Sequence, residues 1–260
     1  MSEQESIWAG REVEVLTLQD VRDVIDGTVA CVIIRGFLDP DASARVVERF
    51  DVATPGTGAY GVVPTRQVGM PLMPVDLDNY FAASERLNAE VDAVFGDVPN
   101  QALRVRAEME RATGWRTVTV DHEGAPYLRS LFVSFPPGAH IPVHVDRSSD
   151  IEGLILIRFP IQLSWNIYLQ PSEGGGELWI YDRAFVRNEV TWVGDGHGGL
   201  EVDDGLLRKV AKFSFETGDL ILFDANRYHE VTAITGDRSR VFAHGFISVD
   251  SSAGEMAYWT

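Results

Sequence analysis

The second half of the chain alternates short β-rich segments with turn residues, and this pattern constrains the fold more than any other feature. From residue 116 to 249, apolar and β-branched runs are separated by clusters such as Pro136-Pro137-Gly138, Gly174-Gly175-Gly176 and Gly218-Asp219. About eight such runs in succession are typical of a jelly roll or a related double-sheet barrel. The predicted strands are Thr117–Val120, Leu128–Phe135, Leu154–Phe159, Gln162–Leu169, Glu177–Tyr181, Lys212–Phe215, Asp219–Phe223, Glu230–Ile234 and Arg240–Val249.

The first 115 residues follow a different pattern, which predicts a mixed and largely helical region. Val29–Ile34 is apolar and β-branched, so it is predicted to be a buried strand. Asp39-Pro40 combines a favoured N-cap residue with proline in a first helical turn. Further helices are predicted over Tyr80–Phe95 and from about residue 100 to 112. Residues 54–76 are rich in glycine and proline and predict a long irregular loop.

Together these patterns predict a single domain over residues 1–260, of the α+β class and mainly β. Its core is predicted to be a double-stranded β-helix, of the jelly-roll or cupin-like kind, over residues 116–250. The helices of residues 1–115 are expected to pack on that core. The one long interruption, at about 182–207, is rich in glycine and aspartate and is a candidate lid over one end of the barrel.

The charge and composition of the chain bear on its partners. It has 39 acidic and 22 basic residues, a net charge of −17, which argues against nucleic acid because such a surface repels phosphate. No apolar run approaches the roughly 18 residues of a membrane span, and the first residues lack a signal-peptide pattern. A single cysteine, Cys31, fits a reducing compartment. We therefore expect a cytoplasmic protein with no membrane partner, and the oligomeric state stays open.

His144 and Asp146 lie two residues apart, after a predicted strand and a Pro-Gly turn. In an extended segment, residues i and i+2 point the same way, so one imidazole and one carboxylate can reach one metal ion. His229 follows a later predicted strand and supplies a second imidazole. Two histidines and one carboxylate on one face of an ion leave positions for O2 and a chelating cosubstrate, which suits non-heme Fe(II).

Two arginines, Arg238 and Arg240, come shortly after His229. A dicarboxylic cosubstrate that chelates a metal at one end needs a charge partner at the other, and a guanidinium binds a carboxylate through bidentate bonds. Both arginines are candidates for this role. His244 would share a strand face with Arg240 and Phe242, and core packing is the favoured interpretation for it.

The predicted strand Gln162–Leu169 places Ser164, Asn166 and Tyr168 on one face. Asn166 and Ser164 are therefore candidates for contacts with cosubstrate or substrate. Trp165 is expected to point the other way, into a sheet interface.

These motifs, taken in order, resemble the 2-oxoglutarate/Fe(II) oxygenase superfamily over roughly residues 127–249. The resemblance implies Fe(II) held by His144, Asp146 and His229, with 2-oxoglutarate and O2 as cosubstrates. It favours Arg240 over Arg238 for the distal carboxylate of 2-oxoglutarate, and it implies that the Tyr168 hydroxyl contacts the same carboxylate. The matching residues are His144-x-Asp146, Tyr168-Leu169, Gly175-Gly176-Glu177-Leu178, Gly218–Phe223, His229 and Arg240.

A narrower resemblance extends into the first half of the chain. Val32–Gly36, Tyr80–Ser84 and Ile141–Val145 are similar to segments of the free-standing alkaloid halogenases of the welwitindolinone type. Those halogenases carry a small residue at the position of Asp146, which leaves a coordination site for chloride. Because Asp146 fills that site here, the resemblance implies a hydroxylase acting on an unactivated C–H bond of a small molecule, natural-product or amino-acid-like.

Three other functions remain open from the sequence. A cupin-type metal enzyme would use a similar barrel without 2-oxoglutarate, and Arg240 and Tyr168 argue against it. A non-catalytic binding module on the same barrel would not need the two histidines and the carboxylate. A hydroxylase of peptide side chains is the third alternative. The sequence identifies neither the substrate nor the choice among hydroxylation, desaturation and cyclisation, because fold alone does not give function.

Overall fold

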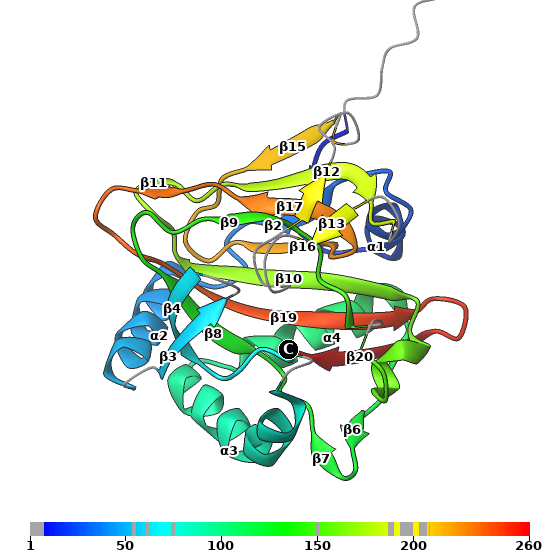
Figure 1. The fold of residues 1–260 in the computed structure, drawn as a ribbon, viewed down its shortest axis with the longest axis horizontal. Helices are drawn as coiled ribbons and strands as arrows, with labels where there is room; N and C mark the ends of the chain where they lie inside the picture. Colours follow the sequence, from blue (N-terminus) through cyan, green and yellow to red (C-terminus); the bar gives the residue numbers. More distant parts are fainter. Residues whose placement is uncertain are drawn as a thin grey trace, which may run out of the picture.

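The computed structural model describes residues 8–53, 56–60, 63–73, 76–148, 151–186, 190–192, 200–202, 207 and 209–260. Figure 1 shows two β-sheets stacked face to face, with helices on the outer side of the larger sheet. This double-sheet core confirms the predicted jelly-roll class with added helices. Among the described residues, no helix is both long and apolar enough to span a membrane.

The larger sheet has the strand order β1-β2-β16-β10-β19-β8-β4-β3. Strand β19 is long enough to pair with β10 along one edge and with both β8 and β20 along the other. A short strand, β5, pairs with β20. The strands are β1 Arg11–Glu12, β2 Cys31–Ile34, β3 Gly56–Tyr60, β4 Val63–Val68, β5 Arg116–Thr117, β8 Leu131–Phe135, β10 Ile161–Gln170, β16 Leu220–Asp224, β19 Arg240–Asp250 and β20 Glu255–Trp259.

The smaller sheet has the strand order β15-β12-β17-β9 and faces the interior side of the larger sheet (Figure 1). Its strands are β9 Ile141–His144, β12 Leu178–Ala184, β15 Val210–Phe213 and β17 Arg227–Val231. Three two-stranded pairs complete the described strands: β6 Asp121–His122 with β7 Ala125–Pro126, β11 Gly174–Gly175 with β18 Ile234–Thr235, and β13 Val190–Trp192 with β14 Leu200–Val202.

Capping side chains fix where the helices begin. Asp39 accepts hydrogen bonds from the backbone N–H groups of Asp41 and Ala42, and this confirms the predicted N-cap. Asn100 caps a later helix, which ends at Gly114 in a left-handed conformation. The helices are α1 Leu18–Ile25, α2 Pro40–Val52, α3 Leu77–Phe95 and α4 Gln101–Thr113; of these, the sequence had not predicted α1.

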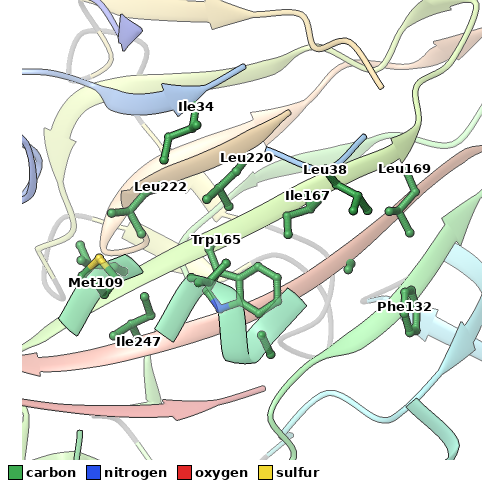
Figure 2. Packing of buried hydrophobic residues seen from close by; sticks show 14 of the residues in the cluster. Ile34, Leu38, Met109, Phe132, Trp165, Ile167, Leu169, Leu220, Leu222 and Ile247 are labelled. Carbon is green, nitrogen blue, oxygen red and sulfur yellow. The ribbon is translucent and has the colours of Figure 1, made fainter. Parts of the chain in front are cut away.

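The main apolar core lies between the larger sheet and the helices. Trp165 on β10 is fully buried there, among Met109 of α4 and the strand residues Leu220 and Leu222 (Figure 2). The side chain of Trp165 does lie on the face opposite Tyr168, but it contacts the helical layer and not a second sheet. Successive side chains of β10 point to opposite faces of the sheet, so its outer face is apolar and its inner face carries polar residues.

Strand β16 is tied to β2 through the Gly218-Asp219 turn. The buried carboxylate of Asp219 accepts hydrogen bonds from Gly36 N (3.1 Å) and from the Arg35 guanidinium. Gly218 has a φ of +90°, and a Cβ there would lie 1.8 Å from the carbonyl oxygen of Leu38. The turn therefore requires glycine, which gives a structural reason for this part of the sequence pattern.

Some predicted segments differ from the structure, and of Thr117–Val120, predicted as a strand, only Thr117 lies in one, β5. Leu154–Phe159, predicted as a strand, contains the single-turn 3-10 helix Ile155–Arg158. Leu154, Leu156 and Phe159 are buried while Ile155 and Ile157 are exposed, so this apolar run packs as a turn and not as a strand. Residues 54–76 are not wholly irregular, because β3 and β4 extend the larger sheet from the edge of β8, where proline and glycine are tolerated.

The candidate lid is only partly described. Residue 182 and its neighbours to Ala184 continue strand β12, and β13 pairs with β14. The remaining residues of 182–207 lie largely outside the described part of the chain, so the lid stays a prediction.

The contact between Gly245 and Trp165 gives a test of this packing. The two residues are paired across β19 and β10, and a Cβ on Gly245 would lie 2.7 Å from Cζ2 of the indole ring. We expect Gly245→Ala to lower the free energy of unfolding by about 1–3 kcal/mol, the usual cost of overpacking, as measured by urea denaturation. Adding Trp165→Phe should cost less in Gly245→Ala than in the wild type, because the smaller ring relieves the clash. Wild-type stability in Gly245→Ala would contradict this packing.

Candidate metal centre and cosubstrate pocket

Strands β9 and β17 of the smaller sheet bring three predicted ligands together. His144 and His229 are directly paired across the two strands. Asp146 lies two residues beyond the end of β9, and its backbone N–H donates to the carbonyl of Ala225 at 2.9 Å, which fixes the chain at the carboxylate. One ligand atom from each of His144, Asp146 and His229 lies within 4.8 Å of the other two. We call these residues the triad.

Backbone carbonyls orient both imidazoles of the triad. Nδ1 of His144 lies 2.9 Å from the carbonyl oxygen of Pro142, and Nδ1 of His229 lies 2.8 Å from that of Arg227. Because a carbonyl only accepts, each Nδ1 donates the hydrogen bond, and Nε2 is the ring atom left to act as a ligand. Histidine ligands of metals are commonly oriented in this way. The Nε2 atom of His229 also lies 3.3 Å from Oδ2 of Asp146.

The electrostatics of the triad favour the protonation states that bind a metal. Burial lowers the pKa of His144 to about 4, so its imidazole is neutral at neutral pH. Burial acts to raise the pKa of Asp146, but the contact with Nε2 of His229 and the nearby imidazoles of His144 and His244 outweigh it and lower that pKa to about 2. A neutral imidazole at His144 and an ionised carboxylate at Asp146 are forms that a divalent metal needs.

The donor set therefore fits a non-heme Fe(II) ion. Two nitrogen atoms and one carboxylate oxygen converge from one side, which is the arrangement that leaves open positions on the ion. His140, the nearest other histidine in sequence, is exposed on the turn before β9, and it is not part of the group.

Arg240 lies in the same pocket as the triad, on the inner face of β19. It is 3% exposed, and its guanidinium donates a hydrogen bond to the carbonyl of Gly176 at 2.9 Å. Three aromatic rings surround the guanidinium carbon, at 4.8 Å for Phe242 and 5.5 Å for both Phe135 and Tyr168. Arg238, the alternative, is exposed before β19 begins. The structure therefore places Arg240 in the pocket of the triad and Arg238 at the surface.

Tyr168 shares this aromatic surrounding. Its ring stacks on Phe215 with centroids 3.9 Å apart, and burial raises the pKa of its hydroxyl to about 12. The hydroxyl therefore stays protonated and can donate a hydrogen bond.

One pocket contains nearly all the predicted site residues. Asn166 and Ser164 line it, as their shared face with Tyr168 predicted. His244, which was expected to pack in the core, is buried but also lines this pocket. The sequence did not single out the apolar lining, although the period-two pattern of the strands places it inward. Those residues are Ile141, Leu178, Phe223, Val231 and Phe242.

The geometry of the triad predicts that each of its three side chains contributes to Fe(II) affinity. Alanine at His144, Asp146 or His229 should weaken Fe(II) binding by more than about 100-fold, because losing a direct ligand costs more than the 10–100-fold typical of its supporting contacts. Anaerobic competition with a chelating dye would measure the affinity. His140→Ala is the matched control and should bind Fe(II) as the wild type does. Equal binding by the His229→Ala and His140→Ala variants would rule out the triad.

The profile of the family described as carrier-protein-independent halogenase WelO5 matches residues 12–260. No curated protein sequence matches the chain significantly.

Solved structures share the fold. An N-substituted L-amino acid dioxygenase from Burkholderia ambifaria AMMD superposes with a TM-score of 0.59 and 12% identity, over 94% of this chain and 92% of that chain. A structure of such a dioxygenase from the same organism in complex with alpha-KG has a TM-score of 0.57 and 14% identity, over 94% and 91%. At these identities the likeness establishes the fold. The family match, which covers nearly the whole chain, establishes more: the chain belongs to the carrier-protein-independent halogenase WelO5 family.

Proposed function

We propose that this protein is an Fe(II)- and 2-oxoglutarate-dependent oxygenase that hydroxylates an unactivated C–H bond of a small molecule. The reaction would consume O2 and decarboxylate 2-oxoglutarate to succinate. The observation that carries the proposal is the shared pocket, in which the triad and the buried guanidinium of Arg240 border one cavity. A metal centre and a separate carboxylate-binding group are what a chelating dicarboxylic acid requires.

Each residue would have a distinct task. His144, Asp146 and His229 would hold Fe(II), which supplies the activation of O2 when bound. Arg240 would bind the distal carboxylate of 2-oxoglutarate. The aromatic rings around the guanidinium keep water away, which strengthens that charge-assisted pair. The protonated hydroxyl of Tyr168 would donate to the same carboxylate.

Asp146 supports hydroxylation over halogenation. In the halogenases that the sequence resembles, a small residue at this position leaves a site for chloride. Here the Asp146 carboxylate lies beside Nε2 of His229, and its lowered pKa keeps it ionised. A carboxylate at that position both takes the coordination site and repels a second anion.

Two comparisons support the proposal that the substrate is a small molecule. The family is described as carrier-protein-independent, which fits a substrate that is free in solution. The dioxygenase from Burkholderia ambifaria is described as acting on N-substituted L-amino acids. Amino-acid-like molecules are therefore the first substrates to test, together with alkaloid-like natural products.

The proposal predicts turnover of the cosubstrate. With Fe(II) and O2, the protein should convert 2-oxoglutarate to succinate, slowly alone and faster with a true substrate, as followed by mass spectrometry. Arg240→Ala should raise the KM for 2-oxoglutarate at least tenfold, because a charge-assisted bidentate pair is lost. Arg238→Ala, the matched control, should leave that KM unchanged. Oxidation of a substrate with no succinate formed would favour a cupin-type enzyme.

The position of Asp146 predicts a change in halide binding. Asp146→Gly removes the carboxylate and should let chloride bind beside the metal, so added chloride should shift the spectrum of the Fe(II)- and 2-oxoglutarate-loaded variant. The wild type should not respond to chloride. A chloride response in the wild type would contradict hydroxylation as the proposed outcome.

A further inference from the structure

His244 and Asn166 form a hydrogen-bonded pair inside the cosubstrate pocket. They lie directly opposite each other on β19 and β10, and Nδ1 of His244 is 2.8 Å from Oδ1 of Asn166. Both side chains line the cavity that holds the triad and Arg240. The pair therefore connects two strands of the larger sheet at the wall that faces the metal ligands.

The chemistry of this bond fixes the direction of the Asn166 amide. An amide oxygen only accepts, so Nδ1 of His244 must donate the proton. With its oxygen turned toward the imidazole, Asn166 directs its N–H2 group away from the ring. Asn166 is only partly buried because it borders the cavity. The pair thus offers N–H donors at a surface that a ligand would contact.

The imidazole of His244 is firmly held. Its residue is 3% exposed, and its ring makes edge-to-face contacts with Phe246 at 4.6 Å and Phe242 at 6.4 Å. A ring packed in this way cannot swing without displacing aromatic neighbours. It can therefore keep the Asn166 amide in one orientation.

The pair lies between the two ends of the proposed cosubstrate site. Asn166 is two residues from Tyr168, which stands beside Arg240. On the other side, His244 lines the same pocket as the triad. A dicarboxylic acid that extends from Arg240 to the triad would pass this wall.

We propose that His244 is a positioning residue, which holds the Asn166 amide so that its N–H group donates to an oxygen of bound 2-oxoglutarate. This inference rests on the proposed function. It assigns to His244 a role through Asn166, and not as a metal ligand or as a core residue alone.

The test is a double-mutant cycle on cosubstrate binding. Fe(II)-loaded protein is titrated with 2-oxoglutarate without O2, and the dissociation constant is followed by the visible charge-transfer absorption. The variants are His244→Leu, His244→Gln, Asn166→Ala and His244→Leu with Asn166→Ala. Fe(II) affinity and thermal stability are measured for each.

We expect His244→Leu and Asn166→Ala each to raise the dissociation constant about tenfold, the effect of one hydrogen bond to a charged group. The double variant should bind no more weakly than Asn166→Ala, because His244 acts through Asn166. His244→Gln, whose amide can still donate to Asn166, should stay within about threefold of the wild type. Fe(II) affinity should not change.

Additive effects in the double variant would overturn the inference, as would unchanged binding in His244→Leu or a loss of Fe(II) affinity there. If His244→Leu does not fold, weak binding by His244→Gln would overturn it instead. Absence of 2-oxoglutarate binding by the wild type would instead contradict the proposed function itself, so the two failures are distinguishable.

Discussion

The pairing of β9 with β17 is the constraint on which the site depends. It sets His144 directly opposite His229, and Asp146 follows where the chain leaves the sheet and bonds to Ala225. A slip of one residue would turn every side chain of β9 to the other face and separate the ligands. The glycines of the neighbouring turn, Gly175 and Gly176, have positive φ values and lie where the chain passes close to Ala233. The metal centre is therefore a product of strand register.

The two faces of the larger sheet have different roles, because successive side chains of each strand point to opposite faces. On β10, the side chain of Trp165 packs against the helices, while Asn166 and Tyr168 line the pocket. On β19, Ala243 and Ile247 lie in the outer core, while Arg240 and His244 face inward. The helices thus stabilise the strands whose opposite faces carry the proposed cosubstrate-binding groups. A substitution in the outer core should therefore also shift the side chains that line the pocket.

Much of the candidate site could be predicted from the sequence, because every second side chain of an extended strand points to the same face. The spacing of His144 and Asp146, and the shared face of Asn166 and Tyr168, need only an extended backbone. The choice of Arg240 over Arg238 came from resemblance, and its physical reason is that β19 begins at Arg240. Other features depend on contacts between distant segments. Leu154–Phe159 is too short an apolar run to distinguish strand from turn, and the His244–Asn166 bond requires the register of β10 with β19.

The central claim is that one pocket binds Fe(II) at the triad and a dicarboxylic acid at Arg240. A crystal structure of the protein prepared without O2, with Fe(II) and 2-oxoglutarate, tests it most directly when anomalous diffraction is recorded at the iron edge. The account predicts one iron peak in contact with Nε2 of His144, Nε2 of His229 and the Asp146 carboxylate, and a ligand carboxylate on the Arg240 guanidinium. An iron peak elsewhere, or a cosubstrate carboxylate bound away from Arg240, would contradict it.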